Sequence, residues 1–404
     1  MDPAGPEVER RLTVAPSEDE RAAFRADVEA WFALHAPRKG SEGDFSAVHI
    51  VSGKSIAQYR EAERHALDIS VGWQRLIQSA GFSGRSWPAE YGGQGGPGWQ
   101  DEEIAQVQSS YGISTKVLAV GLEMLPPVLF THGSEEQRLR YLAPVFRGEE
   151  TWCQLLSEPD AGSDLGSAKS FATPVAGGWA VSGQKVWTSG AGTSDFALLI
   201  ARTDKELAGM GGLSCFLLDM TQPGVEVRPL RQMSGAFHFN EVFMDSVFVP
   251  QESLVGKLGD ARAILRTMLS SERAAIGGGT SARVAQQLIQ LAGRLERTGE
   301  PIVRQELSSA YVRERVLDLT QQRMAAGATV PAGGSVVKLM YSEHARLCAN
   351  LGAWLLGARA TSEASAEDQM WLERLLFAPG LRLGGGTDEI QRNTISERGL
   401  SLPR

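Results

Sequence analysis

Residues 170–187 read SFATPVAGGWAVSGQKVW and contain two β-like runs, Ser170–Val175 and Trp179–Trp187. The glycines at 177 and 178 separate the two runs, as is typical of a tight hairpin turn. Similar short runs follow along the chain, separated by clusters of glycine, proline, aspartate and serine: Phe196–Ala201, Leu213–Asp219, Val225–Pro229 and Glu241–Val249. This pattern predicts a central β domain, to which we assign residues 151–258.

The segments on both sides of the β domain are expected to be helical. Ser17 is followed by Glu20, and Ser134 by Gln137, at the spacing of a capping box that opens a helix. Towards the C-terminus, apolar residues recur at helical spacing in a stripe made of Val336, Met340, Leu347, Leu351 and Leu355. The chain is therefore predicted to be an α+β protein with an N-terminal α-helical domain (1–150) and a C-terminal α-helical domain (259–404).

Composition excludes several classes of function. The 404 residues include 40 Lys and Arg against 48 Asp and Glu, a net charge of −8, which argues against a nucleic-acid partner. No apolar run approaches the roughly 20 residues that span a bilayer, and the N-terminus does not resemble a signal peptide. Cys153, Cys215 and Cys348 are far apart and the six histidines are not clustered, so we expect no metal site and no disulfide framework. A cytoplasmic protein without a membrane partner is expected, and an organic cofactor remains the main route to chemistry.

Three motifs carry a resemblance to a known family. They are WCQLLSEPDAGSD at 152–164, GQKVWTS at 183–189 and GTDEIQRN at 386–393. The first resembles the flavin- and substrate-binding signature of the acyl-CoA dehydrogenase family, and the other two resemble its second and third flavin motifs. They occur in the order and spacing of that family, and the resemblance covers about residue 20 to residue 404.

The resemblance implies a fold, a reaction and partners. The fold would be an N-terminal helical domain, a β-barrel-like central domain and a C-terminal four-helix bundle. The reaction would be FAD-dependent α,β-dehydrogenation of an acyl-CoA to the trans-2-enoyl-CoA, in which a carboxylate removes the α-proton and the β-hydrogen leaves as hydride to flavin N5. An electron-transfer flavoprotein would accept the electrons by analogy. The assembly would be a homotetramer, or a heterotetramer with a related subunit.

The motif residues also suit this chemistry by their type. Trp187 could cover one face of the flavin ring, and the hydroxyls of Thr188 and Ser189 could bind its edge. Gly162 permits close backbone approach, and Thr387 can cap a helix whose first N–H groups suit a pyrophosphate. The predicted cofactor-binding residues are Gln154, Leu156, Ser157, Gly162, Ser163, Trp187, Thr188, Ser189, Arg294, Thr387 and Glu389. The predicted substrate-binding residues are Ser163, Arg273 and Gly386.

The catalytic base is expected away from its commonest position in the family. Many members carry a glutamate immediately before the Gly-Thr of the third motif, but this chain has Gly385 there. A subset that includes isovaleryl-CoA dehydrogenase carries the glutamate in another helix, just before an arginine, and Glu272 followed by Arg273 matches that pattern. We therefore predict Glu272 as the base. The resemblance implies that the N–H of Gly385 binds the thioester oxygen.

Two other functions remain open at this point. One is an oxygen-using flavoenzyme on the same scaffold, similar to a nitroalkane oxidase or a monooxygenase. The other is a non-catalytic subunit that stabilises a catalytic relative. Bleaching of the flavin by an acyl-CoA without oxygen would argue against the first. The intact Trp187-Thr188-Ser189 motif argues against the second, and isolation of a colourless apo-protein would support it.

Overall fold

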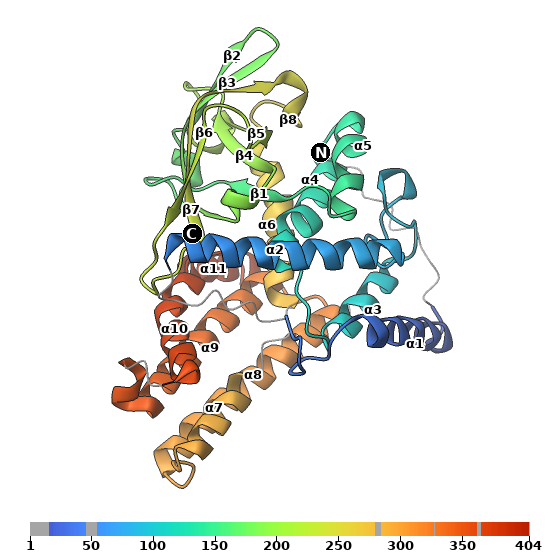
Figure 1. Cartoon of the computed structure of the whole chain (residues 1–404). Coiled ribbons are helices and arrows are strands. Elements are labelled where there is room, and N and C mark those ends of the chain that lie inside the picture. Colours follow the sequence, from blue (N-terminus) through green and yellow to red (C-terminus); the bar gives the residue numbers. More distant parts are fainter. Residues whose placement is uncertain (1–15, 46–54, 279–283, 327, 362–364, 404) are drawn as a thin grey trace. The chain divides into compact units, whose positions relative to one another are not determined.

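The computed structural model of the chain describes residues 16–45, 55–278, 284–326, 328–361 and 365–403 (Figure 1). The contacts within the chain divide it into two compact units. The first contains the residues up to 231 and residues 236–268, and the second contains residues 232–235 and 269–404. Each unit has a buried hydrophobic core of its own.

Helices form the first part of the first unit. Ser17 and Ser134 complete the two predicted capping boxes, because each hydroxyl accepts a bond from the backbone N–H three residues later. Ser55 completes a third capping box, which the sequence analysis did not identify. The α-helices that precede the sheet are α1 (Glu18–His35), α2 (Ile56–Ser79), α3 (Gly98–Gln108), α4 (Leu125–His132) and α5 (Glu135–Phe146).

An eight-stranded sheet completes the first unit. Its strands are β1 (Trp152–Leu155), β2 (Phe171–Val175), β3 (Gly178–Ser189), β4 (Phe196–Arg202), β5 (Leu213–Asp219), β6 (Val225–Leu230), β7 (Phe239–Pro250) and β8 (Leu254–Val255). The order is β6-β7-β3-β2-β4-β5-β8, with β1 parallel to β4. The hairpin predicted at residues 177 and 178 joins β2 to β3. The sequence analysis missed β1 and β8, which have only four and two residues.

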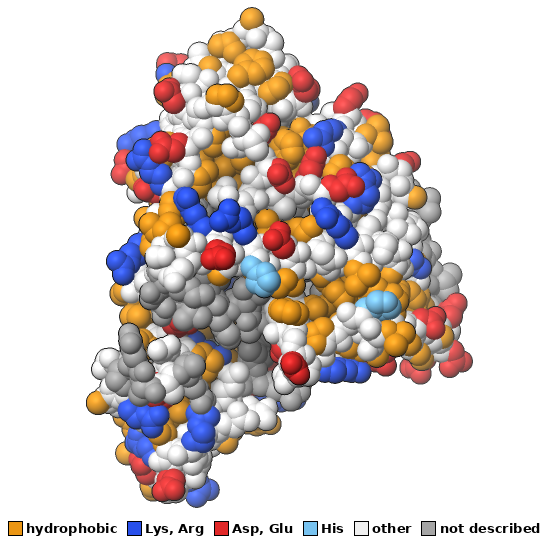
Figure 2. All heavy atoms as spheres, in the orientation of Figure 1, with side chains coloured by type: hydrophobic (Ala, Val, Ile, Leu, Met, Phe, Trp, Pro, Cys, Tyr) orange, Lys and Arg blue, Asp and Glu red, His pale blue; other side chains and the backbone are white. Residues whose placement is uncertain are grey.

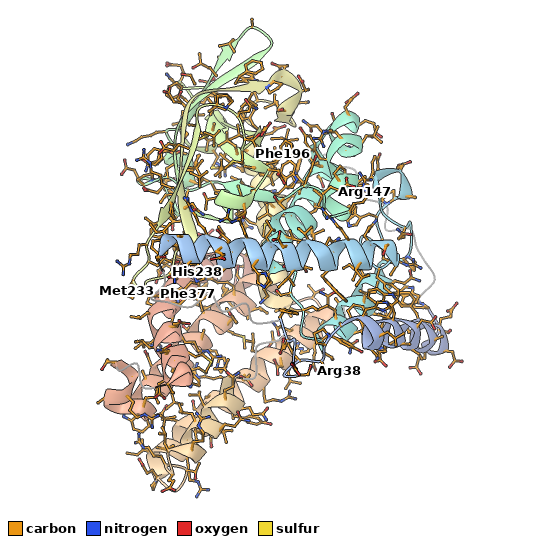
Figure 3. All side chains as sticks on the ribbon, viewed as in Figure 1. Arg38, Arg147, Phe196, Met233, His238 and Phe377 are labelled. Atoms are coloured by element: carbon orange, nitrogen blue, oxygen red, sulfur yellow. The ribbon has the colours of Figure 1, made fainter. Side chains whose placement is uncertain are left out.

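The two faces of the sheet are buried in different cores. Leu198 of β4 packs in one core with Val128 of α4 and Leu142 of α5, whereas the neighbouring Leu199 faces the other core. Trp152 at the start of β1 stacks on Phe196 at the start of β4, with ring centroids 5.1 Å apart. Phe196 is labelled in Figure 3. Full burial of an aromatic or large aliphatic side chain contributes about 1.5–3 kcal/mol, and Trp152 is 2% exposed. The first motif therefore begins at a point that is well fixed by the core.

The second unit is helical, as predicted. Helix α6 (Ala261–Gly278) begins in the first unit and ends in the second, which continues with α7 (Val284–Arg294), α8 (Pro301–Ala325), α9 (Gly333–Leu356), α10 (Ala366–Leu381) and α11 (Asp388–Thr394). The predicted apolar stripe lies on α9, where Leu351 and Leu355 are buried and Val336, Met340 and Leu347 are half-buried. Trp371 of α10 is fully buried in the same core. Helices α7, α8, α9 and α10 thus share one core.

The surface carries charges of both signs, and the cysteines are buried. Acidic, basic and hydrophobic side chains all occur on the upper part of the face shown in Figure 2, which displays the β region. Cys153, Cys215 and Cys348 are buried and not joined by disulfides. Within the segments that the structure describes, no helix is both long enough and apolar enough to cross a membrane.

Candidate functional site

The first motif forms a tight turn that follows β1. The backbone N–H of Glu158 donates to the carbonyl of Ala161 over 2.9 Å, and the N–H of Ala161 donates back over 3.1 Å. Because Pro159 and Asp160 lie between these bonds, they are exposed at the tip of the turn, and Gly162 and Ser163 are exposed directly after it. The predicted ligand-binding end of the motif is therefore accessible, while Glu158 is buried at its base.

A buried ion pair joins this turn to β3. Lys185 Nζ lies 2.7 Å from Glu158 Oε1, and the side chains of Lys185 and Glu158 are 0% and 6% exposed. Burial lowers the pKa of the Lys185 ammonium, and the facing carboxylate opposes that shift. Burial alone would raise the pKa of Glu158, but the Lys185 charge and the bonds that the carboxylate accepts outweigh it, so the pKa of Glu158 is lowered. Glu158 is therefore a carboxylate that is paired and ionised.

Trp187 stands on a strained bulge in β3. The register of β3 against β7 shifts between Lys185 and Thr188, and Trp187 has a left-handed backbone with φ +62°. Such a conformation is rare for a bulky residue and is typical of bulges that redirect a side chain near a functional site. The indole is 57% exposed and contacts the ring of Phe239 edge-on, with centroids 5.8 Å apart. Trp187 is thus held outward in a conformation that packing alone does not favour.

Two oxygens in these segments fit the predicted flavin. Among the described residues, neither Gln154 Oε1 nor Thr188 Oγ1 has a hydrogen-bond partner, although both atoms are buried. A buried polar atom without a partner costs about 1–3 kcal/mol, and a hydrogen bond to a ligand bound at these motifs would remove that cost. The heteroatoms of a flavin ring would supply such hydrogen bonds, and the exposed Trp187 would supply an apolar face. The residues present are therefore suited to a flavin.

The third motif lies in the second unit, on a loop with two left-handed glycines. Gly385 has φ +66° and Gly386 has φ +86°, values that favour glycine. The side-chain amide of Gln391 donates to the carbonyls of Gly385 and Gly386 over 2.9 and 3.2 Å, which fixes this backbone. The Thr387 hydroxyl accepts a bond from the N–H of Ile390, so Thr387 is the N-cap of α11, as predicted.

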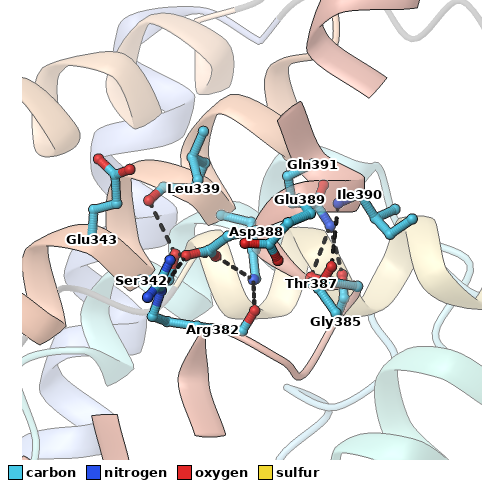
Figure 4. Close-up of polar contacts among 12 residues, drawn as sticks. Leu339, Ser342, Glu343, Arg382, Gly385, Thr387, Asp388, Glu389, Ile390 and Gln391 are labelled. Carbon is cyan, nitrogen blue, oxygen red and sulfur yellow. Dashed lines mark hydrogen bonds and ion pairs between the residues drawn. The ribbon is translucent and has the colours of Figure 1, made fainter. Parts of the chain in front are cut away.

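The buried side chain of Asp388 anchors this loop through hydrogen bonds and ion pairs (Figure 4). Its carboxylate is fully buried and accepts bonds from Lys338 Nζ at 2.9 Å, Ser342 Oγ at 2.6 Å and Arg382 Nε at 2.7 Å. Burial would raise the pKa of Asp388, but the bonds from Arg382, Ser342 and Lys338 outweigh it and lower the pKa. The loop between Arg382 and Asp388 is thus closed by a buried polar cluster on α9.

Comparison with known proteins assigns the family. Residues 46–149, 153–247 and 261–400 match, in this order, the N-terminal, middle and C-terminal domains of acyl-CoA dehydrogenase. Acyl-CoA dehydrogenase IpdE1 of Mycobacterium tuberculosis is 32% identical over 386 residues, which cover 94% of this chain and 97% of that protein. The chain belongs to the acyl-CoA dehydrogenase family. The family predicted from the three motifs is confirmed, and the protein is an oxidoreductase that dehydrogenates acyl-CoA with a flavin.

Further relatives agree with this acyl-CoA dehydrogenase assignment. FadE34 of Mycobacterium tuberculosis, also an acyl-CoA dehydrogenase, is 34% identical over 342 residues, which cover 82% of this chain and 46% of that protein. Two solved structures share the fold with a TM-score of 0.75: a Tcur3481-Tcur3483 steroid ACAD, at 24% identity over 96% of this chain and 99% of that one, and the ChsE4-ChsE5 complex of Mycobacterium tuberculosis, at 22% identity over 97% and 100%.

The remaining predicted residues differ in what the structure shows of them. Leu156 and Ser157 are half-buried and Ser189 is exposed, all beside the first two motifs. Arg294 at the end of α7 and Glu389 in α11 are both exposed. Glu272 and Arg273 fall within α6, but their side chains lie outside the described residues. Their roles stay predictions.

Sequence reasoning missed the residues that anchor these acyl-CoA dehydrogenase motifs. Glu158, Lys185 and Asp388 lie inside the quoted motifs but were not assigned a role, because polar neighbours such as Ser157, Gln184 and Glu389 gave no signal that these charges are buried. Lys338 and Ser342 lie on α9, 50 and 46 residues before Asp388, and no local pattern connects them with the third motif.

Proposed function

We propose that the flavin of this acyl-CoA dehydrogenase is FAD and that Glu272 is the base that removes the α-proton of the acyl-CoA. The observation that carries the flavin proposal is the outward, strained Trp187, together with the buried oxygens of Thr188 and Gln154, which have no partner in the described residues. The resemblance to the family implies that this flavin is FAD. Trp187 would lie against the ring, and Thr188, Ser189 and Gln154 would bind its polar edge. FAD, when bound, would accept the hydride from the β-carbon.

The choice of Glu272 rests on the third motif. Gly385 has no side chain that could accept a proton, so the carboxylate must come from elsewhere in the chain. Glu272 precedes Arg273, as in the members of the family that carry the base in another helix. A base of this kind is partly desolvated when the acyl-CoA binds, which brings its pKa closer to neutrality. Gly385 and Gly386, fixed by Gln391, would present backbone N–H groups to the thioester oxygen.

The remaining ligands and partners follow the family. Ser163, exposed after the first turn, would contact the acyl-CoA or a phosphate, while Thr387, Glu389 and Arg294 would contact FAD. An electron-transfer flavoprotein would reoxidise the enzyme. We further propose a tetramer, formed by this chain alone or with a related subunit, since a solved structure of the same fold is a complex of two named chains.

The test is anaerobic reduction of the purified yellow protein by acyl-CoAs of different classes: short, branched, long and sterol-derived. Glu272→Gln should keep the visible flavin spectrum and slow flavin reduction by roughly 10²–10⁴-fold. Glu306→Gln, which changes an exposed glutamate of α8, is the matched control and should reduce at the rate of the unchanged protein.

Three results would contradict the proposal. Reduction of the Glu272→Gln protein at the control rate would exclude Glu272 as the base. A yellow protein that no acyl-CoA bleaches, but that consumes oxygen with another substrate, would favour an oxygen-using flavoenzyme. A folded protein that stays colourless with added FAD would favour a non-catalytic subunit, and its native mass would show whether it assembles alone.

A further inference from the structure

The side chains of the buried pair Glu158–Lys185 also form hydrogen bonds with the backbone of neighbouring segments. Lys185 Nζ also donates to the carbonyl of Leu156 over 3.1 Å. Glu158 Oε2 accepts from the backbone N–H of Lys169 over 2.6 Å, and Glu158 Oε1 accepts from that of Ser170 over 3.0 Å. One ion pair thus joins three segments: the turn of the first motif, the start of β2 and the middle of β3.

The pair also lies at the base of the Trp187 bulge. In a regular strand, side chains alternate between the two faces, but in β3 Lys185 and Val186 are both buried and Trp187 points outward. The N–H of Val186 donates to the carbonyl of Ser157 over 2.9 Å, so the bulge is bonded directly to the first motif. Glu158 and the carbonyl of Leu156 hold the Lys185 side chain in the interior. The backbone at Lys185, where the bulge begins, is therefore fixed.

Stability alone does not account for this arrangement. Removing two charges from water is costly, and replacing a buried ion pair with apolar side chains of similar size is often neutral or stabilising. A buried pair that bonds to three segments does define their relative position, which an apolar pair cannot do with the same directionality.

We infer that Glu158 and Lys185 are positioning residues for the flavin: they fix the first-motif loop and the Trp187 bulge relative to each other before the flavin binds. The inference rests on the proposed function, because it needs FAD to bind at these two segments. It concerns affinity for FAD and not proton transfer, and neither side chain has to touch the flavin.

The test compares single and double replacements by the affinity of the apo-protein for FAD and by its melting temperature without FAD. Glu158→Gln and Lys185→Met should each lower the melting temperature and weaken FAD binding. The double variant Glu158→Leu with Lys185→Met leaves no buried charge, but the N–H groups of Lys169 and Ser170 lose their acceptor. It should therefore regain only part of the melting temperature that each single variant loses, while its FAD affinity stays about tenfold or more below that of the unchanged protein. If the pair were merely structural, the double variant would regain FAD affinity in step with the melting temperature.

The exposed pair Arg228–Glu226 on β6 is a matched control outside the three motifs. It has the same N–O distance of 2.7 Å, but its side chains are 57% and 59% exposed. The double variant Arg228→Gln with Glu226→Gln should therefore change neither the FAD affinity nor the melting temperature, because an exposed pair contributes little.

The outcomes separate this inference from the proposed function. Absence of FAD binding by the unchanged protein would overturn the proposed function. Binding by the unchanged protein and equally tight binding by the Glu158→Leu with Lys185→Met variant would overturn only the inference. If that double variant does not fold, Glu158→Gln decides at a temperature where its circular dichroism is native: unchanged FAD affinity overturns the inference and an affinity about tenfold weaker supports it.

Discussion

A buried lysine–carboxylate ion pair anchors both the first and the third motif, but the other hydrogen bonds of the two carboxylates differ. Behind each loop lies a buried lysine–carboxylate pair, Lys185–Glu158 at 2.7 Å and Lys338–Asp388 at 2.9 Å. Glu158 receives its other bonds from backbone N–H groups, whereas Asp388 receives them from side chains, Ser342 and Arg382. The first carboxylate therefore joins segments of backbone, and the second joins a loop to the side chains of a helix.

The charges are also balanced differently. Glu158 faces one lysine, but Asp388 faces a lysine and the partly exposed guanidinium of Arg382. Of the two anchoring carboxylates, Asp388 is the one that pairs with two cations. Removing Asp388 would leave Lys338 buried without a carboxylate, whereas removing Lys338 would leave Asp388 bonded to Arg382 and Ser342. We therefore expect the loss of Asp388 to destabilise the protein more than the loss of Lys338 does.

The largest expected effect tests this asymmetry. Asp388→Asn should lower the free energy of unfolding of the second unit by about 3–5 kcal/mol, the usual effect of leaving a buried charge without its partner. Lys338→Met should cost less than half as much, since Arg382 still compensates the carboxylate. Urea unfolding followed by circular dichroism measures both. Glu389→Gln, which alters the exposed neighbouring carboxylate, should leave stability within about 0.5 kcal/mol. Equal costs for Asp388→Asn and Lys338→Met would refute the asymmetry.

The pH dependence of stability tests the role of the Asp388 carboxylate a second time, and the expected effect is smaller. The pKa of Asp388 is lowered in the folded protein, so its carboxylate stabilises the fold at pH values above the ordinary aspartate pKa of 3.8. As the pH falls below that value, the unfolded chain takes up a proton that the folded carboxylate resists, and stability is lost. Acid unfolding of Asp388→Asn should therefore depend less steeply on pH in this range than acid unfolding of Glu389→Gln. Parallel curves for the two variants would show that Asp388 is not the group that titrates.

Whether a feature can be predicted from the sequence depends on how far apart along the chain the interacting residues are. The strands around Gly177 and the cap at Thr387 depend on neighbours within a few residues, so period and turn residues were sufficient to find them. The pairing of Glu158 with Lys185 spans 27 residues and that of Lys338 with Asp388 spans 50, and both depend on burial, which no local pattern contains.

Trp187 shows a different limit of sequence reasoning. Its residue type predicted a stacking role, but the sequence did not indicate the bulge or the left-handed backbone that expose the ring. These depend on the register shift against β7. Glu272, the proposed base, illustrates a third case: its position before Arg273 predicts the role, and its side chain lies outside the described residues.

The smallest expected effect compares two replacements of Trp187 that both remove the ring. At φ +62°, alanine is strained by its Cβ and glycine is not, so Trp187→Gly should be more stable than Trp187→Ala by about 1 kcal/mol. In an ordinary strand position the order would be reversed, because glycine loses more backbone freedom on folding. Thermal unfolding without FAD measures the difference, and a more stable alanine variant would mean that the bulge relaxes when the indole is absent.

That comparison bears on function as well. Both variants should lose FAD affinity to a similar extent, because both lack the indole that would cover the ring. If glycine raises stability while affinity falls, the strain at position 187 is retained for the cofactor and opposes stability. The Lys185–Glu158 pair would then hold a conformation that the strand would not adopt alone, whereas the Lys338–Asp388 cluster holds a loop whose glycines already favour their conformation. The difference between the two anchors would follow from the backbone that each has to hold.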